Sequence, residues 1–374
     1  MTKKNSNETV NGVAAVASAQ CTNDQQFEKY RYNGGHGFAA EDANAMYDRY
    51  HGKQVVKCGE DVKNGPDRIV NGVEVQTKYC ATPAKSVSAA FENGRYRYPG
   101  MKLEVPKDQY NEAVRIVRGR IANGQVPGVT DPNMAEQMVL KGHYTYDEAV
   151  RIAKAGNWDS IKFDIRTQAV ACAFSCGLSF AINYFTAKSN GATHQQALKA
   201  ASTQALKSGG ATMVTGVAVQ QLLRTQVGRD FSAVATKAAK PLVQAAMKTE
   251  VGKTVLSKTA SVVAGRQVSG MAAAQVLTKA ARSNAVMGTV AFVGSTLPDA
   301  VDFCRGKITG RQFAENTTSN AASIGGGWAG ASAGAAVGTA VCPGVGTVLG
   351  GIIGGIGGGI SASMGVRKVF SLFK

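Results

Sequence analysis

The residues whose types and spacing could do chemistry lie between Asn64 and Cys80, in the stretch NGPDRIVNGVEVQTKYC. This stretch contains an acid, Asp67, an amide, Gln76, and an amine, Lys78. A carboxylate and an amide oxygen can hold a divalent cation, and an ammonium group can steer a phosphate or orient a water molecule. These residue types indicate metal-assisted chemistry on a phosphate ester.

A β-hairpin is expected to bring these side chains together. Asn71-Gly72 between two short apolar runs is a strong signal for a two-residue turn, because both central positions need positive φ. The turn sets a register in which Asp67 stands opposite Gln76, with Cβ atoms roughly 5 Å apart. Period-two alternation adds Glu74 and Lys78 to the same face. An acid, an amide, a second acid and an amine therefore converge.

The same register has one awkward consequence. It pairs Ile69 with Glu74 on the polar face, and it turns Arg68 to the face of Val75. A charged side chain on an apolar face leaves open a bulged or shifted hairpin. An exposed hairpin with ordinary surface charges is the alternative to a catalytic one.

The motif Pro66-Asp67 with Gln76-Thr77-Lys78 resembles the PD-(D/E)xK nuclease superfamily, within it the Mrr-like restriction endonucleases that carry Q-x-K. The resemblance covers about residues 33–105. Patterning predicts helices over 38–50 and 83–92 and strands over 54–58 and 101–105, with two further strands in the hairpin. This order, α-β-β-β-α-β, is that of the superfamily's core.

The resemblance implies a role for each residue. Asp67 is the direct metal ligand, Gln76 takes the second ligand position, and Lys78 orients water and stabilises developing charge. Mg²⁺ or Mn²⁺ is the implied metal, and no small-molecule cofactor is expected. Gln76 stands where most members have an acid, so Glu41 or Glu74 is expected to compensate.

Glu41 belongs to the first predicted helix, where superfamily members often carry a carboxylate that reaches the metal. The expected metal set is therefore Asp67, Gln76 and Glu41. Asp42 and Asp48 on the same helix compete for this role. Alternatively, Glu41 only complements the helix dipole.

Basic residues are concentrated in the C-terminal part. From Arg166 onward, 20 Lys and Arg accompany only 5 Asp and Glu, whereas the two kinds nearly balance before it. Thr167 to Ala187 is free of charge for 21 residues, long enough for the roughly 30 Å of a bilayer core. A buried core helix is the alternative. The lysines that follow, set among Ala and Val, suit an anionic membrane surface or DNA.

The segment from Asn316 to Val366 has no charged residue and no histidine across 51 positions. Glycines recur in it every four residues, which predicts a helical hairpin with a glycine stripe along each arm. It resembles the glycine-zipper segments of membrane-inserting bacterial proteins and toxins. The predicted packing glycines are Gly326, Gly330, Gly334, Gly338, Gly346, Gly350, Gly354 and Gly358. A flexible tail or a soluble helical pair is the alternative.

We therefore expect an α+β or α/β N-terminal domain with a restriction-endonuclease-like core, followed by an all-α, glycine-rich domain. The N-terminus lacks the apolar run of a signal peptide, and seven cysteines without paired metal-type spacing suit a reducing cytoplasm. The expected ranges are a flexible arm over 1–32, the nuclease-like domain over 33–122, a helical connector over 123–165, a basic membrane-associated region over 166–315 and the zipper over 316–374.

The function that this organisation predicts is a metal-dependent nuclease held at the cytoplasmic face of the bacterial inner membrane, cleaving DNA in a defence or toxin role. DNA, anionic lipids and further copies of the chain are the expected partners. One alternative is a pore-type protein with an N-terminal sensor. The other is a basic, virion-associated or nucleic-acid-packaging protein, and a cytoplasmic location remains the alternative to the membrane.

Overall fold

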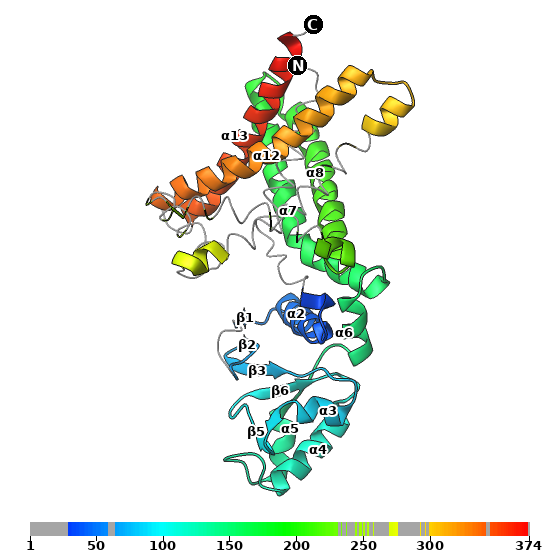
Figure 1. Cartoon of the computed structure of the whole chain (residues 1–374), viewed down its shortest axis with the longest axis vertical. Helices are drawn as coiled ribbons and strands as arrows, with labels where there is room; N and C mark the ends of the chain where they lie inside the picture. The colour runs from blue at the N-terminus through cyan, green and yellow to red at the C-terminus, as the bar shows by residue number, and fades with distance from the viewer. Residues whose placement is uncertain are drawn as a thin grey trace. The chain divides into compact units, whose positions relative to one another are not determined.

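The computed structural model describes residues 29–58, 64–230, 269–275, 299–341 and 345–372, together with isolated positions between 233 and 296. Contacts divide the chain into two compact units (Figure 1). One unit is Gln26–Phe163, and the other contains Asp164–Lys374. The arm predicted over 1–32 and the lysines predicted between 237 and 282 fall mostly outside the described residues.

The N-terminal unit is built on a mixed five-stranded sheet of order β1-β2-β3-β6-β7. The strands β1, β2 and β3 are antiparallel neighbours, while β6 pairs in parallel with β3 and with β7. Helix α2 precedes β1, and helix α3 follows β3, so the predicted order of elements is observed up to α3; two further strands, β4 and β5, then intervene before β6. The bounds are Gly35–Tyr50 for α2, Val55–Lys57 for β1, Arg68–Val70 for β2, Val73–Thr77 for β3, Pro83–Ser88 for α3, Lys102–Val105 for β6 and Val139–Lys141 for β7.

The predicted hairpin register is confirmed. Asn71 and Gly72 have φ of 48° and 82°, as the two-residue turn requires. The Cα partners are Val70 with Val73, Ile69 with Glu74, and Arg68 with Val75. Just beyond this ladder, the main-chain N–H of Asp67 donates to the oxygen of Val75 at 3.0 Å.

The helix predicted over 83–92 is wrong in its second half. Helix α3 ends at Ser88, and Phe91–Glu92 forms strand β4, paired with β5 at Arg95–Tyr96. The turn between them is Asn93-Gly94, with φ of 51° and 75°. This is the same turn signal as Asn71-Gly72, and it was present in the sequence.

The range predicted as a helical connector contributes to the sheet. Strand β7 lies within it and pairs with β6. Helix α4, Tyr110–Ala122, lies just before the predicted connector. Within the connector lie η2 at Pro132–Met134, α5 at Ala135–Met138 and α6 at Tyr146–Ala153. Helix α6 begins at a capping box in which Thr145 and Glu148 satisfy each other's main-chain N–H groups.

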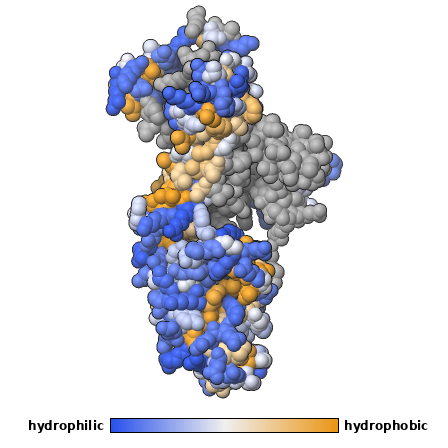
Figure 2. Space-filling view, turned by 180° about the vertical axis from the view of Figure 1, so that it is seen from behind, coloured by the Kyte–Doolittle hydropathy of each residue, from blue (hydrophilic) through white to orange (hydrophobic). Residues whose placement is uncertain are grey.

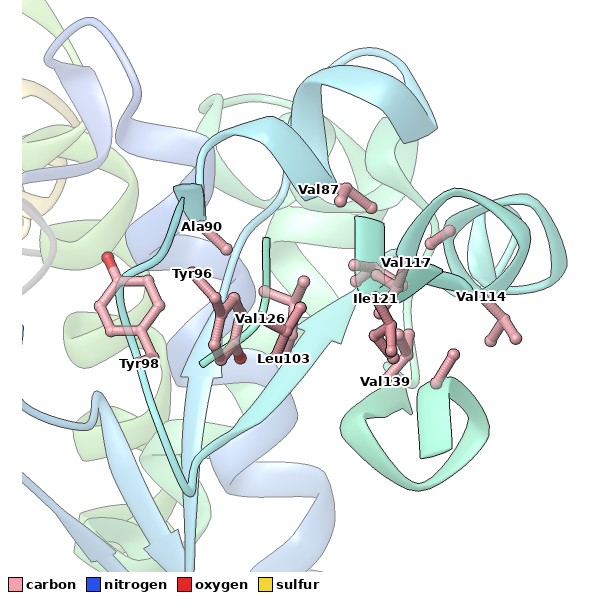
Figure 3. Packing of buried hydrophobic residues seen from close by; sticks show 13 residues of the cluster. Val87, Ala90, Tyr96, Tyr98, Leu103, Val114, Val117, Ile121, Val126 and Val139 are labelled. Carbon is pink, nitrogen blue, oxygen red and sulfur yellow. The ribbon is translucent and has the colours of Figure 1, made fainter. Parts of the chain in front are cut away.

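The main apolar core lies where α3, α4 and α5 pack against β6 and β7. Leu103, Val117, Ile121 and Val139 are all at most 4 % exposed. Figure 3 shows Val117, Ile121 and Val139 gathered together within this cluster, with Tyr98 at its edge. The core fixes β6, and β6 in turn supports β3, which carries the candidate site.

The C-terminal unit contains two long helical hairpins. Helix α7, Trp158–Ser189, is followed by α8, His194–Leu223, and α12, Gly310–Val341, is followed by α13, Val345–Leu372. The charge-free run at 167–187 is thus helical. Among the described residues, no helix combines the length and the hydropathy that a membrane span requires.

The predicted glycine stripes face each other where the structure describes them. A Cβ added to Gly330 would lie 2.0 Å from the main-chain oxygen of Gly354, and one added to Gly358 would lie 2.2 Å from that of Gly326. Only glycine allows the two backbones to approach this closely. Gly334, Gly338, Gly346 and Gly350 lie in the same helices, but their packing falls outside the described part, as do residues 342–344 between the two helices.

Candidate functional site

Asp67 and Gln76 meet as the register requires. The Gln76 Nε2 group donates to both Asp67 oxygens, at 2.9 Å each. The main-chain N–H of Thr77 donates to Asp67 Oδ2 at 2.7 Å. The carboxylate therefore replaces a main-chain acceptor where the β2–β3 ladder ends, and this holds Asp67 against β3.

The other end of the Gln76 amide is unusual. Gln76 is 4 % exposed, and its Oε1 atom is buried with no hydrogen-bond partner. Leaving a buried acceptor unpaired costs about 1–3 kcal/mol. Rotating the amide by half a turn would aim this oxygen at Asp67, an arrangement that two acceptors tolerate only with a cation or proton between them.

Glu41 of α2 acts electrostatically on this pair. Burial and the nearby charge of Asp67 raise the pKa of Glu41 to about 8, against the opposing effects of Lys57 and Lys78. Burial also raises the pKa of Asp67, while the Thr77 N–H group and Lys78 lower it. Two carboxylates that repel each other favour a shared proton or a shared cation.

Lys78 lies on the same face, directly after β3. Its ammonium is 5.3 Å from the centre of the Tyr98 ring, and Arg97 approaches the same ring at 5.5 Å. The Arg97 Nη2 group donates to Asn64 Oδ1 at 2.7 Å, close in sequence to Asp67. The β4–β5 hairpin, which the predicted helix over 83–92 excluded, therefore brings Arg97 to the same aromatic ring as Lys78.

Glu74, the remaining residue of the predicted site, is exposed and lies on β3 two residues nearer the turn than Gln76. Its charge acts on Cys58, where burial and then Glu74 and Asp67 raise the pKa of the thiol. The structure thus gathers Glu41, Asp67, Gln76 and Lys78, with Glu74 at the margin of the group.

The donor set fits a hard divalent cation in part. Two carboxylates and an unpaired amide oxygen are the ligand types that Mg²⁺ takes, with water and phosphate oxygens to complete six positions. Among the residues that the structure describes, no three His, Cys, Asp or Glu side chains lie close enough to form a metal site. A metal here would therefore depend on the Gln76 oxygen as a ligand.

Arg68 explains the awkward consequence of the hairpin register. It is fully buried on the opposite face of the sheet, where Nη2 lies 2.6 Å from Glu104 Oε1 and 3.3 Å from Asp48 Oδ2. Its Nη1 group donates to Thr77 Oγ1 at 2.9 Å, and Asn44 donates to Glu104 at 3.1 Å. The face of the sheet that carries Val75, which the sequence predicted to be apolar, therefore holds a buried ion-pair network.

This network ties the helix that carries Glu41 to the strand that carries Gln76. Burial by itself would raise the pKa of Asp48. Hydrogen bonds from His143 and Lys53 and the charge of Arg68 outweigh burial and hold this pKa well below its usual range. Asp48 is thus engaged on the opposite face and does not compete with Glu41. Asp42 accepts hydrogen bonds from Tyr30 and Lys57. Glu41 is the helix carboxylate whose pKa responds to Asp67.

Comparisons with known proteins match two separate parts of the chain. Residues 17–122 match the family model described as the YeeR C-terminal domain, and residues 307–365 match the model described as a C13G5.2-like glycine zipper domain. No solved structure matches the chain.

A relative is known from Escherichia coli K12, the inner membrane protein YeeR. It is 52 % identical over 99 residues, which are 25 % of this chain and 19 % of the relative. The chain therefore spans about a fifth of the length of this relative. The candidate site falls in a part of the chain similar to the YeeR C-terminal domain, and α12 and α13 fall in a part similar to a glycine zipper.

Proposed function

We propose that the N-terminal unit is a metal-dependent nuclease and that the glycine-rich helices associate it with the cytoplasmic face of a bacterial inner membrane. The observation that carries the enzymatic part is the mutual repulsion of Glu41 and Asp67 beside the unpaired Gln76 oxygen. Carboxylates with perturbed pKa values around an unsatisfied acceptor are typical of functional sites.

In this proposal Asp67, Gln76 and Glu41 hold a Mg²⁺ or Mn²⁺ ion. A bound divalent cation would neutralise phosphate charge and lower the pKa of a water molecule. Thr77 N–H keeps Asp67 Oδ2 in place, and once the Gln76 amide rotates to aim its oxygen at the metal, Asp67 Oδ1 is the oxygen that would face the metal. Lys78 orients the attacking water and balances the charge that develops on the phosphate.

The membrane part rests on the glycine packing and on the comparisons. Gly330 and Gly358 pack against the backbone of the facing helix, as in close helix pairs of membranes. The E. coli relative is called an inner membrane protein, and the glycine-zipper model covers α12 and α13. A nuclease at this location would meet incoming DNA, which suits a defence or toxin role.

The test uses the purified full chain, in mild detergent, with plasmid DNA and Mg²⁺. Asp67→Asn and Lys78→Met should each reduce cleavage by at least about 100-fold. The matched controls are Asp147→Asn and Lys85→Met, two exposed positions outside the site. Cleavage that survives in both Asp67→Asn and Lys78→Met, or is absent from the wild type with both metals, would refute the nuclease.

A second candidate is a membrane-permeabilising protein in which the N-terminal unit is a sensor. The glycine-packed α12–α13 hairpin favours it, because such pairs can associate further in a membrane. Release of an encapsulated dye from anionic vesicles by the Asp67→Asn protein, at the wild-type rate, would support this function over the enzymatic one.

A further inference from the structure

The α7–α8 hairpin holds its two helices together through polar groups. Ser175 Oγ lies 3.1 Å from Ser208 Oγ and accepts a hydrogen bond of 2.8 Å from Thr212. Thr167 donates to Gln220 Oε1 at 2.9 Å. Ser175, Ser208, Thr212 and Gln220 are all at most 3 % exposed. We call this line of contacts between α7 and α8 the polar seam.

An ion pair closes one end of the polar seam. Arg224 directly follows α8, and its two terminal nitrogens lie 2.6 and 2.7 Å from the two oxygens of Asp164. Both side chains are fully buried. The geometry is bidentate, so each charge is neutralised by a partner within the hairpin and not by water.

Small residues bring the helices close along the polar seam. A Cβ added to Gly216 would lie 2.3 Å from Gln168 Oε1, and one added to Gly209 would lie 2.1 Å from Cys176 Sγ. Small residues with hydrogen-bonding side chains between two helices are typical of helix pairs in a lipid environment.

The outward faces of the same helices carry large apolar side chains. Leu206 is 74 % exposed, Val214 is 70 % exposed and Phe185 is 69 % exposed. From Ser208 to Leu223 the chain has no charged residue. Figure 2 shows a band of apolar colour across the described surface of the helical part, next to a hydrophilic cap.

This distribution differs from the one that water selects, because polar groups are buried at the helix contact while large apolar side chains are exposed. In water, burying apolar surface is the main driving force for helix pairing, and polar side chains remain outside. Here Ser, Thr and Gln side chains are buried between the helices together with Val219, Leu223 and several alanines of α8, while larger apolar side chains such as Leu206 and Val214 are exposed. In lipid, by contrast, exposed apolar groups cost nothing and polar groups must find partners inside the protein.

We propose that the outer face of α7–α8 binds the acyl chains of a phospholipid bilayer. Lys188 and Lys199 lie near the turn between α7 and α8, and Lys207 lies midway along α8; all three are exposed and complement anionic headgroups. This proposal rests on the membrane location proposed above and deepens it, since it assigns lipid contact to a hairpin distinct from the glycine zipper.

Tryptophan fluorescence tests the proposal, because the chain has only two tryptophans. In the full chain with Trp158→Phe and Trp328→Phe, a probe is introduced by Val214→Trp, and the control probe by Leu140→Trp on an exposed position of β7. The protein is bound to phosphatidylcholine vesicles that contain phosphatidylglycerol, with or without bromine atoms on the acyl chains. Phe185→Trp is a second, aromatic-for-aromatic probe if Val214→Trp lowers the helical content.

We expect the brominated lipid to quench the Val214→Trp and Phe185→Trp probes by at least about twofold and to leave the Leu140→Trp control unchanged. Lys207→Gln should weaken binding to these vesicles about fivefold, whereas Lys85→Gln should not. Unquenched hairpin probes in vesicle-bound protein, failure of the protein to bind vesicles, or shielding of the probes by self-association without lipid would each overturn the proposal.

DNA cleavage measured on the same samples separates this proposal from the nuclease. Cleavage with unquenched hairpin probes would leave the enzymatic function standing and remove the lipid contact. Quenched probes without cleavage would do the reverse.

Discussion

Replacing Glu41 by Gln tests the electrostatics of the candidate site directly. The carboxyl of Glu41 has an ordinary pKa of 4.5 and a pKa of about 8 in the folded protein, mainly because of burial and then because of Asp67. Between these two values the folded protein keeps a proton that the unfolded chain releases. The free energy of unfolding must therefore fall as the pH rises through this window.

The full shift would correspond to a loss of about 5 kcal/mol, at about 1.4 kcal/mol for each pH unit. Glu41 retains partial contact with solvent, so we expect screening to reduce the loss to about 1–3 kcal/mol between pH 5 and pH 8. Glu41→Gln removes the titrating group and should flatten this dependence. In the wild type at pH 8, Mg²⁺ should restore most of the lost stability by neutralising the pair.

Hydrogen–deuterium exchange of peptides that cover β3, measured in EDTA across this pH range, reports the stability of the N-terminal unit alone. After correction of the measured exchange rates for the intrinsic rate, the free energy of opening of β3 should fall as the pH rises in the wild type and should stay constant in Glu41→Gln. Asp147→Asn, an exposed position outside the site, is the matched control. Equal pH dependence in the wild type and Glu41→Gln would refute the reasoning, as would a Mg²⁺ effect that survives in Asp67→Asn.

Three further predictions concern the residues around this site and the glycine zipper. Arg68→Met should destabilise the N-terminal unit by about 3–5 kcal/mol, because it leaves Glu104 buried without its cation, and adding Glu104→Leu should recover much of the loss in the same exchange measurement. Gln76→Glu should raise Mg²⁺ affinity about tenfold in calorimetry and lower stability in EDTA, since it adds a third acid to a repelling pair. Gly330→Leu should open the α12–α13 hairpin to proteolysis, whereas Gly325→Leu, whose added side chain meets open space, should not.

Local turn chemistry predicted the central part of the site. Asn71-Gly72 specified a turn type, the turn specified a register, and the register placed Asp67 opposite Gln76. The same rule applied to Asn93-Gly94 would have found β4 and β5, and with them the position of Arg97. Pro83 does begin a helix, but the turn at Asn93-Gly94 requires the chain to leave the helix before strand β4.

The buried network on the opposite face could not be predicted in the same way. Arg68, Glu104 and Asp48 are up to 56 positions apart in the sequence, and each by itself reads as a surface charge. Their burial depends on the parallel pairing of β3 with β6 and on the packing of α2 against the sheet. Such long-range contacts leave no local pattern, because their partners come from separate elements.

The sequence by itself determined the features that arise within a few residues: the hairpin and its register, the helical glycine stripes, and the charge-free runs. Tertiary structure alone decided that Glu41 acts on Asp67, that Gln76 keeps an unpaired oxygen, and that α7 and α8 turn their polar groups toward each other. The physical reason is that backbone preferences act between neighbours in sequence, whereas pKa values and buried hydrogen bonds depend on groups that only folding brings together.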